Sequence, residues 1–289
     1  MFNTVPLVRY FNPNFREERI SDCELRVQVS STELCLAVYD PITVAFELIE
    51  KYAIQKSYSG IKTHEAIARI LQNNSLSKRD FSGVEILYMG KEYTLVPKAL
   101  FEEEKSLNFL SLSHKINEGT LVKTCYIHRI EAYLVYGIDS EIKRTLDTFF
   151  PKAIFHHYIF PMIEGVFSNL SPSTGLIVHV RDFHFDAILV KDGKIILCNG
   201  FEFQTPEDFI YFVLLIYDRH QLNREEIPLY FCGEIESGSS IYTICHKFIR
   251  DIFFLNRNES IAIAPPEGET EPLPSHFYFN LLHHSFENH

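Results

Sequence analysis

The chain has 289 residues and is 46% hydrophobic, which allows one large buried core or two smaller ones. Its net charge of −11, without a segregated basic patch, disfavours nucleic-acid binding because an acidic surface repels a phosphate backbone. None of the six cysteines falls in a C-x-x-C pair, so we expect no disulfides. The sequence shows no signal-peptide pattern and no apolar window of about 18 residues, so we expect a cytoplasmic protein without membrane insertion.

The first third of the chain predicts a hairpin followed by further strands and a helix. Residues 24–39 alternate apolar and polar on both sides of Ser30-Ser31-Thr32, which is the pattern of two antiparallel strands joined by a short turn. The expected elements after it are a strand at 42–49, a helix at 64–71 begun by Thr63, and strands at 84–89 and 93–96.

The middle of the chain repeats this alternation of strand and helix. The expected elements are a strand at 126–136, a helix capped by Asp139 or Ser140 and stopped by Pro151, a strand at 152–159, and a helix at 161–170. Residues 169–175 are rich in turn formers and mark the expected boundary between two halves.

The last third of the chain has the clearest pattern. Strands are expected at 176–182, 183–191 and 194–198, and Asp192-Gly193 suits a type I′ turn because both residues tolerate positive φ. A helix is expected from Thr205, its N-cap, to about His220. A strand at 229–232, a helix at 240–256, a short strand at 261–264 and a peripheral tail complete the expected order.

The residues from 174 onward also carry a resemblance to a known family. Its runs are TGLIVHV, FDAILVKDGKIILCNGFEFQTPEDFIYFVLLIY and IPLYFCGEI, and its matching positions are Asn199, Phe201, Thr205, Glu207, Asp208, Tyr211 and Gly233. In these the chain resembles a family of uncharacterised bacterial proteins with an actin-like ATPase fold. The resemblance spans about residues 19–264 and speaks to the fold, since the family's biochemical activity is undefined.

The resemblance and the order of elements predict an α/β protein with a duplicated actin-like, ribonuclease H-like fold. We expect two lobes, each with a mixed sheet made of a three-strand antiparallel meander plus parallel strands, flanked by helices. The expected boundaries are an N-terminal lobe over 1–170 with inserted or appended α/β elements, a C-terminal lobe over 171–264 and a peripheral tail over 265–289.

The actin-like ATPase superfamily implies phosphate-binding motifs that this chain largely lacks. An Asp-x-Gly is expected at the first hairpin of each half, where glycine lets backbone N–H groups approach phosphates. The first turn, Ser30-Ser31-Thr32, has neither an acid nor a glycine. In the second, Arg181-Asp182-Phe183-His184, only Asp182 fits, and the Gly-Gly expected after the fourth strand is reduced to Gly233-Glu234.

Other site chemistries find little support in the sequence. A two-metal nuclease needs converging carboxylates, and the available acids are Asp182, Asp186, Asp208 and Glu234. Asp208 is explained by its place at a helix N-terminus. His179 and His184 flank the second hairpin and can approach each other, but neither they nor the His156-His157 and His283-His284 pairs complete a ligand set. We therefore expect no metal and no catalytic residue.

The sequence thus favours a non-catalytic actin-like binding or scaffolding protein that has lost the phosphate-binding motifs. We expect no cofactor, with ATP and Mg²⁺ disfavoured, no ATPase activity, and an unidentified protein partner; an oligomer is compatible with these features. The alternative is a degenerate ATPase that binds a nucleotide or small acidic ligand as a regulatory switch. Its ligand would be lined by Arg181, Asp182, Gly233 and Glu234.

Overall fold

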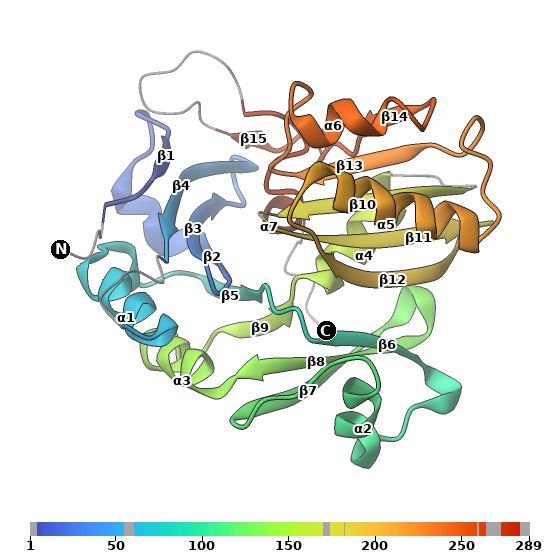
Figure 1. Cartoon of the computed structure of the whole chain (residues 1–289). Coiled ribbons are helices and arrows are strands. Elements are labelled where there is room, and N and C mark those ends of the chain that lie inside the picture. The colour runs from blue at the N-terminus through green and yellow to red at the C-terminus, as the bar shows by residue number, and fades with distance from the viewer. Residues whose placement is uncertain are drawn as a thin grey trace. The chain divides into compact units, whose positions relative to one another are not determined.

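The computed structural model describes residues 5–54, 61–169, 174–181, 183–258, 260–263 and 273–283. The chain divides into two compact units, which are described separately (Figure 1). Unit 1 comprises Met1–Tyr126, Tyr133–Phe160 and Glu259–Leu273. Unit 2 comprises Ile127–Ala132, Pro161–Asn258 and Pro274–His289.

Unit 1 is built on a sheet whose order is β1-β4-β3-β2-β5-β9, with β15 also paired to β4. Its strands are β1 (Val8–Phe11), β2 (Glu24–Val29), β3 (Glu33–Asp40), β4 (Ala45–Ala53), β5 (Gly83–Tyr88), β9 (Ile154–His157) and β15 (Ala262–Ile263). Strands β2, β3 and β4 form an antiparallel meander, and β5 and β9 continue the sheet in parallel. This is the mixed sheet that the sequence predicts.

Two amphipathic helices of unit 1 are α1 (Thr63–Asn73) and α3 (Ser140–Phe149). The predicted stripe of α1 is buried: Ala66, Ile67, Ile70 and Leu71. Thr63 itself lies inside the helix, because α1 begins one residue earlier than expected, with Lys62 at the N-cap position. In α3 the predicted cap is confirmed, since Asp139 accepts hydrogen bonds from the amides of Glu141 and Ile142.

A small third sheet has the order β6-β8-β7, from β6 (Tyr93–Pro97), β7 (Thr120–Ile127) and β8 (Ala132–Asp139). Helix α2 (Ser106–Ser111) adds Leu110 to its core, beside Val96 and Val135. The single strand expected at 126–136 is wrong. Glu131 adopts a left-handed φ of 48° and turns the chain from β7 into β8, while the apolar alternation continues across the turn and hides it.

Unit 2 repeats the meander-plus-parallel pattern in a sheet of order β12-β11-β10-β13-β14. Its strands are β10 (Thr174–Arg181), β11 (His184–Lys191), β12 (Lys194–Glu202), β13 (Leu229–Gly233) and β14 (Ile252–Phe254). Strands β10, β11 and β12 are antiparallel, and β13 and β14 run parallel to β10. The predicted tight turn is confirmed, with positive φ at Asp192 (50°) and Gly193 (73°).

The helices near this sheet in the chain are α4 (Ile159–Asn169), α5 (Pro206–Arg219), α6 (Ser240–Cys245) and α7 (Phe279–His283). The Thr205 side chain accepts a hydrogen bond from the Asp208 amide, and the Asp208 side chain accepts one from the Thr205 amide. These two bonds form a capping box at the start of α5. The helix expected at 240–256 is wrong beyond Cys245. Residues 252–254 instead form β14, because these β-branched and aromatic side chains pair in parallel with β13.

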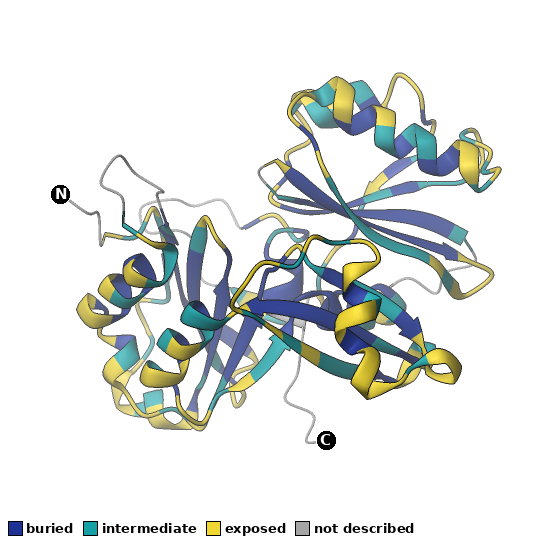
Figure 2. Cartoon of the chain, turned by 60° about the horizontal axis from the view of Figure 1, so that its bottom comes forward, coloured by how far each residue is buried: buried dark blue, intermediate teal, exposed yellow. Residues whose placement is uncertain are grey.

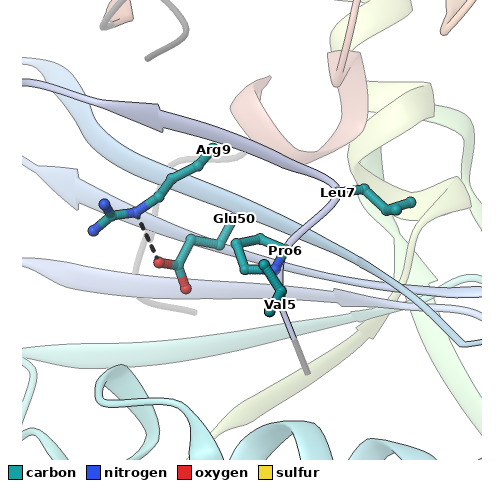
Figure 3. A pocket seen from close by; sticks show the side chains of 5 residues that line it. All are labelled: Val5, Pro6, Leu7, Arg9 and Glu50. Atoms are coloured by element: carbon teal, nitrogen blue, oxygen red, sulfur yellow. Dashed lines mark hydrogen bonds and ion pairs between the residues drawn. The ribbon is translucent and has the colours of Figure 1, made fainter. Parts of the chain in front are cut away.

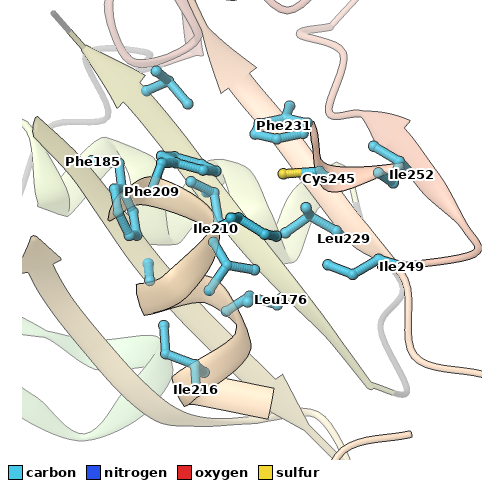
Figure 4. Packing of buried hydrophobic residues seen from close by; sticks show 14 of the residues in the cluster. Leu176, Phe185, Phe209, Ile210, Ile216, Leu229, Phe231, Cys245, Ile249 and Ile252 are labelled. Carbon is cyan, nitrogen blue, oxygen red and sulfur yellow. The ribbon is translucent and has the colours of Figure 1, made fainter. Parts of the chain in front are cut away.

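The hydrophobic core of unit 2 lies between the sheet and α5 and α6 (Figure 4). Phe209 of α5 is fully buried, with its ring centroid 4.6 Å from that of Phe185 and 6.0 Å from that of Phe231. Figure 2 shows that α5 carries both buried and exposed residues, and Tyr211 on it is 61% exposed. Many of the phenylalanine side chains of unit 2 are therefore packed in its hydrophobic core, where each buried ring removes a large apolar area from water.

Across the part of the chain that the structure describes, the helices are too short or too polar to cross a membrane.

Candidate functional site

The carboxyl ends of the parallel strands of unit 2 lie where an open α/β sheet binds ligands. From β10 the chain turns to β11 and β12 on one side and then returns to β13 on the other, so the strand order reverses between β10 and β13. Open α/β sheets bind ligands beyond the carboxyl ends of their strands at such a reversal. Arg181 ends β10, Gly233 ends β13 and Phe254 ends β14, and we call this region the switch-point site.

A buried carboxylate, Asp186 of β11, gathers three side chains beside the switch-point site. Nε2 of His184 lies 3.1 Å from Oδ1 of Asp186. Nδ1 of His179 lies 3.5 Å and Nη2 of Arg181 lies 3.4 Å from Oδ2 of Asp186. All four side chains project from one face of the β10–β11 hairpin, because the antiparallel register places His179 opposite Asp186 and Arg181 opposite His184.

The charges of this cluster follow from burial and proximity. Burial by itself raises the pKa of the Asp186 carboxyl, but Arg181, His179 and His184 together hold that pKa well below its usual range. Burial lowers the pKa of His179 against the opposing effect of Asp186, which favours the neutral imidazole. The cluster therefore combines an ionised carboxylate with the Arg181 cation and a neutral His179.

Helix α7 reaches the same cluster through one hydrogen bond. Nδ2 of Asn280 lies 3.2 Å from Nε2 of His179, and both side chains are buried. With the Nδ1 proton of His179 directed to Asp186, Nε2 accepts the hydrogen bond that the Asn280 amide donates. A chain of three side chains thus links β11, β10 and α7.

Gly200 and Gly233 allow close packing around the Asp186 cluster, because a Cβ at either position would clash with its neighbours. A Cβ at Gly200, which pairs with Asp186 from β12, would lie 2.7 Å from Cε1 of His184. At Gly233 the backbone has a φ of +89°, and a Cβ there would lie 2.5 Å from the carbonyl oxygen of Val180. The tight approach of β13 to β10 therefore requires glycine at 233.

Residues 274–281, here called the C-terminal segment, cover the ends of β13 and β14. The Gly233 amide donates a 3.0 Å hydrogen bond to the carbonyl of His276, whose own Nε2–H donates a 2.6 Å bond to the carbonyl of Ile235. The His276 ring stacks on Phe254 at a centroid distance of 3.9 Å and an interplanar angle of 20°. The Arg257 amide donates a hydrogen bond to the Ser275 carbonyl at 2.8 Å. Nη1 of Arg257 donates a second bond to the Pro274 carbonyl at 2.7 Å.

The sequence predicted a peripheral tail from residue 265. In the structure His276 is 8% exposed and Phe279 and Leu281 are fully buried, so this part of the tail is packed into the fold. Its prolines and glycines indicated a peripheral segment, whereas hydrogen bonds to Gly233 and Ile235, more than 40 residues earlier, decide its place.

The structure brings three of the four predicted ligand residues to neighbouring strand ends. Val180 pairs with Gly233, so Arg181, the last residue of β10, and Glu234, the first residue after β13, lie at adjacent strand ends. The Arg181 guanidinium contacts Asp186, and Glu234 is exposed. Asp182 lies outside the described residues. A ligand-binding role for these four residues stays a prediction.

Sequence reasoning did not identify His179, His276, Asn280 or Asp186 as a connected group. A signal for two of them was present, because the register of the predicted hairpin pairs His179 with Asp186 within otherwise apolar strands. No local signal connects His276 or Asn280 to them, since the contacts form only in the folded chain.

The row Cys232, His179 and Asp186 on three adjacent strands has the residue types of a nucleophilic triad. The geometry argues against that chemistry. The Cys232 thiol donates to the carbonyl of Val178 at 3.8 Å, and burial raises its pKa, so the reactive thiolate is suppressed. Nε2 of His179 is engaged by Asn280. Within the described ranges no three His, Cys, Asp or Glu side chains are arranged to hold a metal ion.

The hairpin of unit 1 that corresponds to the first phosphate turn is closed by its own side chain. Oγ of Ser30 accepts hydrogen bonds from the amides of Thr32 (3.1 Å) and Glu33 (3.0 Å). The Ser30 amide donates to the Glu33 carbonyl at 2.9 Å. This serine turn uses internally the N–H groups that a phosphate-binding hairpin directs to its ligand.

An open pocket of about 600 Å³ lies on unit 1, lined by Val5, Pro6, Leu7, Arg9 and Glu50 (Figure 3). Nε of Arg9 lies 3.1 Å from Oε1 of Glu50, so the cation and the carboxylate of the pocket bind each other. Among the described residues that line this pocket, Arg9 and Glu50 are the charged ones and they pair with each other, which makes it a weaker ligand site than the strand ends of unit 2.

The chain belongs to the family described as protein of unknown function (DUF3822), whose model matches residues 12–252. No curated protein matches the chain in sequence. The predicted resemblance to an uncharacterised family with an actin-like fold is confirmed.

Solved structures confirm the actin-like fold. A protein of Bacteroides thetaiotaomicron VPI-5482 with an actin-like ATPase fold and unknown function superposes with a TM-score of 0.72 at 21% sequence identity. The match covers 83% of this chain and 93% of that one. A chain of the PilM–PilN type IV pilus biogenesis complex superposes with a TM-score of 0.56 at 11% identity, covering 83% of this chain and 90% of that one.

Proposed function

We propose that this chain is a non-catalytic actin-like protein that binds or scaffolds a protein partner and has lost the phosphate chemistry of the ATPase superfamily. The observation that carries the proposal is the serine turn of unit 1. Oγ of Ser30 accepts from the amides of Thr32 and Glu33, so two N–H groups of the hairpin are already bound. A phosphate would have to displace these bonds, and the turn offers neither glycine nor carboxylate in exchange.

The second hairpin supports the same conclusion. Its cation, Arg181, contacts the fully buried Asp186, and its tip carries Phe183, which is 69% exposed. An Arg181 side chain held by an ionised carboxylate attracts an anionic ligand less strongly than an unpaired one does, because the two charges largely cancel at a distance. The bulky ring occupies a position where phosphate-binding turns have small residues.

A binding role is supported by a solved complex in which one chain has the same fold. The PilM–PilN structure, whose fold is shared, is a complex for type IV pilus biogenesis, so the fold acts in that case within an assembly. For the present chain the exposed aromatic side chains Phe183 and Tyr211 provide the kind of apolar contact that interfaces use.

The proposal is tested by measuring ATP turnover and ligand-induced stabilisation on the purified wild-type protein. We expect no turnover and no change in melting temperature with millimolar ATP or GTP, with or without Mg²⁺, because a ligand of the folded state must raise its stability. Hydrolysis at about 1 per second or faster would refute the non-catalytic assignment. Cross-linking and capture from the source cell then identifies the partner, with a Phe183→Ser, Tyr211→Ser variant as the matched control for surface contacts.

The alternative, a degenerate ATPase that binds a nucleotide or small acidic ligand at Arg181, Asp182, Gly233 and Glu234, predicts the opposite result in the stability measurement. It is favoured only by the adjacency of Arg181 and Gly233 on β10 and β13. A nucleotide-dependent rise in melting temperature without turnover would select it over the binding or scaffolding role.

A further inference from the structure

The C-terminal segment contacts the ends of β13 and β14 at the switch-point site. Its residues 275–278 form turns and belong to neither a helix nor a strand. The hydrogen bonds of His276 to Gly233 and Ile235 are therefore isolated contacts with the end of β13, not part of a sheet ladder.

The His276 ring occupies a position shaped for a planar nitrogen heterocycle. One of its faces stacks on Phe254, whose ring is in turn stacked with Tyr242 at 5.3 Å and 6°. A carbonyl oxygen only accepts hydrogen bonds, so the ring nitrogen that lies 2.6 Å from the Ile235 carbonyl carries a proton. An aromatic stack and one directed N–H bond together define both the plane and the orientation of a ring.

The backbone of residues 233–235 supplies two hydrogen-bonding groups beside the His276 ring, here called the recognition edge. The Gly233 amide is a donor and the Ile235 carbonyl is an acceptor, and both are used by His276, through its carbonyl and its ring N–H respectively. A ligand that presents an acceptor beside an N–H donor on a flat ring satisfies the same pair. Gly233 adopts a positive φ of +89° at this strand end.

We propose that the C-terminal segment is an internal ligand that holds the switch-point site closed, with His276 in the place of a planar nitrogen heterocycle. When the ring is removed or the segment leaves, a heterocycle with an N–H donor binds between Phe254 and the Ile235 carbonyl. The proposal goes beyond the binding or scaffolding role, and its failure would leave the expected absence of ATP turnover in the wild-type protein unaffected.

Chemical rescue tests the proposal. His276→Gly removes the ring and keeps the backbone carbonyl that Gly233 binds. Imidazole at millimolar concentration is expected to raise the melting temperature of this variant by about 2 °C or more, as a ligand of the folded state does. Benzimidazole, which is larger but has the same donor, is expected to act likewise. N-methylimidazole, which lacks the N–H donor, is expected to give less than half of the imidazole shift.

Two controls separate site occupancy from general effects of the additive. His246→Gly makes the same chemical change at an exposed histidine of unit 2, 4.7 Å by ring centroid from Tyr242, and is expected to show no imidazole shift. The wild-type protein is also expected to show none, because its site is filled. An equal shift in the wild type, or no shift in a cooperatively folded His276→Gly, would overturn the proposal.

A second measurement covers the case in which His276→Gly does not fold. Hydrogen exchange on the wild-type protein is expected to show the amides of residues 233–235 and 275–281 exchanging together, at least tenfold faster than the centres of β10 and β11. Exchange of these amides only together with the whole of unit 2 would show that the segment is a fixed part of the core, and would refute its role as a displaceable ligand.

Discussion

His179 of β10 and Asp186 of β11 face each other across adjacent strands, with Nδ1 of the imidazole 3.5 Å from Oδ2 of the carboxylate. The same imidazole is held from its other nitrogen by Asn280 of α7. One buried carboxylate therefore orients both the second hairpin and the helix at the end of the chain.

Asp186→Asn tests how much stability this carboxylate contributes. The substitution keeps the size of the side chain and removes the charge that Arg181 faces in a buried setting. We expect the free energy of unfolding to fall by about 3 kcal/mol, because removing one partner leaves the other charge uncompensated. Asp192→Asn at the exposed hairpin turn is the control, with an expected change within about 0.5 kcal/mol. Urea denaturation compares the two, and equal effects would contradict the assigned role.

Gly200→Ala tests the packing around His184. The added Cβ would lie 2.7 Å from Cε1 of His184 and 3.3 Å from Oδ1 of Asp186, so the imidazole must shift and its contact with Asp186 is disturbed. We expect a loss of about 1–3 kcal/mol, the usual cost of overpacking. Gly238→Ala adds the same methyl group in the same unit with no atom within 4 Å, and its expected effect is within about 0.5 kcal/mol. A stability of Gly200→Ala equal to that of the control would show that the cluster tolerates rearrangement.

Ser30→Ala tests the serine turn of unit 1. Loss of the Oγ acceptor leaves the Thr32 and Glu33 amides without their side-chain partner, and we expect a loss of about 1 kcal/mol. Ser31→Ala, at the exposed neighbouring position, is expected to change stability by less than half of that. Thermal melts of both variants decide the point. A more stable Ser30→Ala variant would refute the view that these hydrogen bonds close the turn.

Stability is expected to fall between pH 7.5 and pH 5.5. Burial lowers the pKa of His179 and of His276, so the unfolded chain binds protons on these side chains more tightly than the folded one. Their contribution is complete above the unfolded value of about 6.5 and is lost as the pH falls toward the lower folded values. The melting temperature should therefore be lower at pH 5.5.

Variants assign this pH dependence to the two buried histidines. His179→Gln, and more strongly the double variant with His276→Gln, should reduce the difference in melting temperature between the two pH values. His246→Gln, at an exposed position, should leave that difference unchanged. A double variant with the full wild-type difference would place the effect on other histidines.

Much of the fold was predictable because its signals are local. The Asp192-Gly193 turn, the Thr205 cap with Asp208, and the alternating strands on both sides of Ser30 act within a few residues. Each of these sequence patterns is compatible with few backbone conformations. The order of elements and the mixed sheets could therefore be predicted from the patterns. The errors arose where local signals agree with two structures, as at 126–136 and 246–256, and pairing with another strand made the choice.

The sequence by itself determined the meander at 174–202, the helix that follows it, and the absence of glycine and carboxylate from the first turn. Only the tertiary structure decided that Ser30 closes that turn, that Asp186 gathers two histidines and Arg181, and that His276 fills the end of β13. The reason is physical. Contacts such as Gly233 to His276 join residues far apart in the chain, and they form only when the packing of the whole sheet compensates the entropy of closing the loop between them.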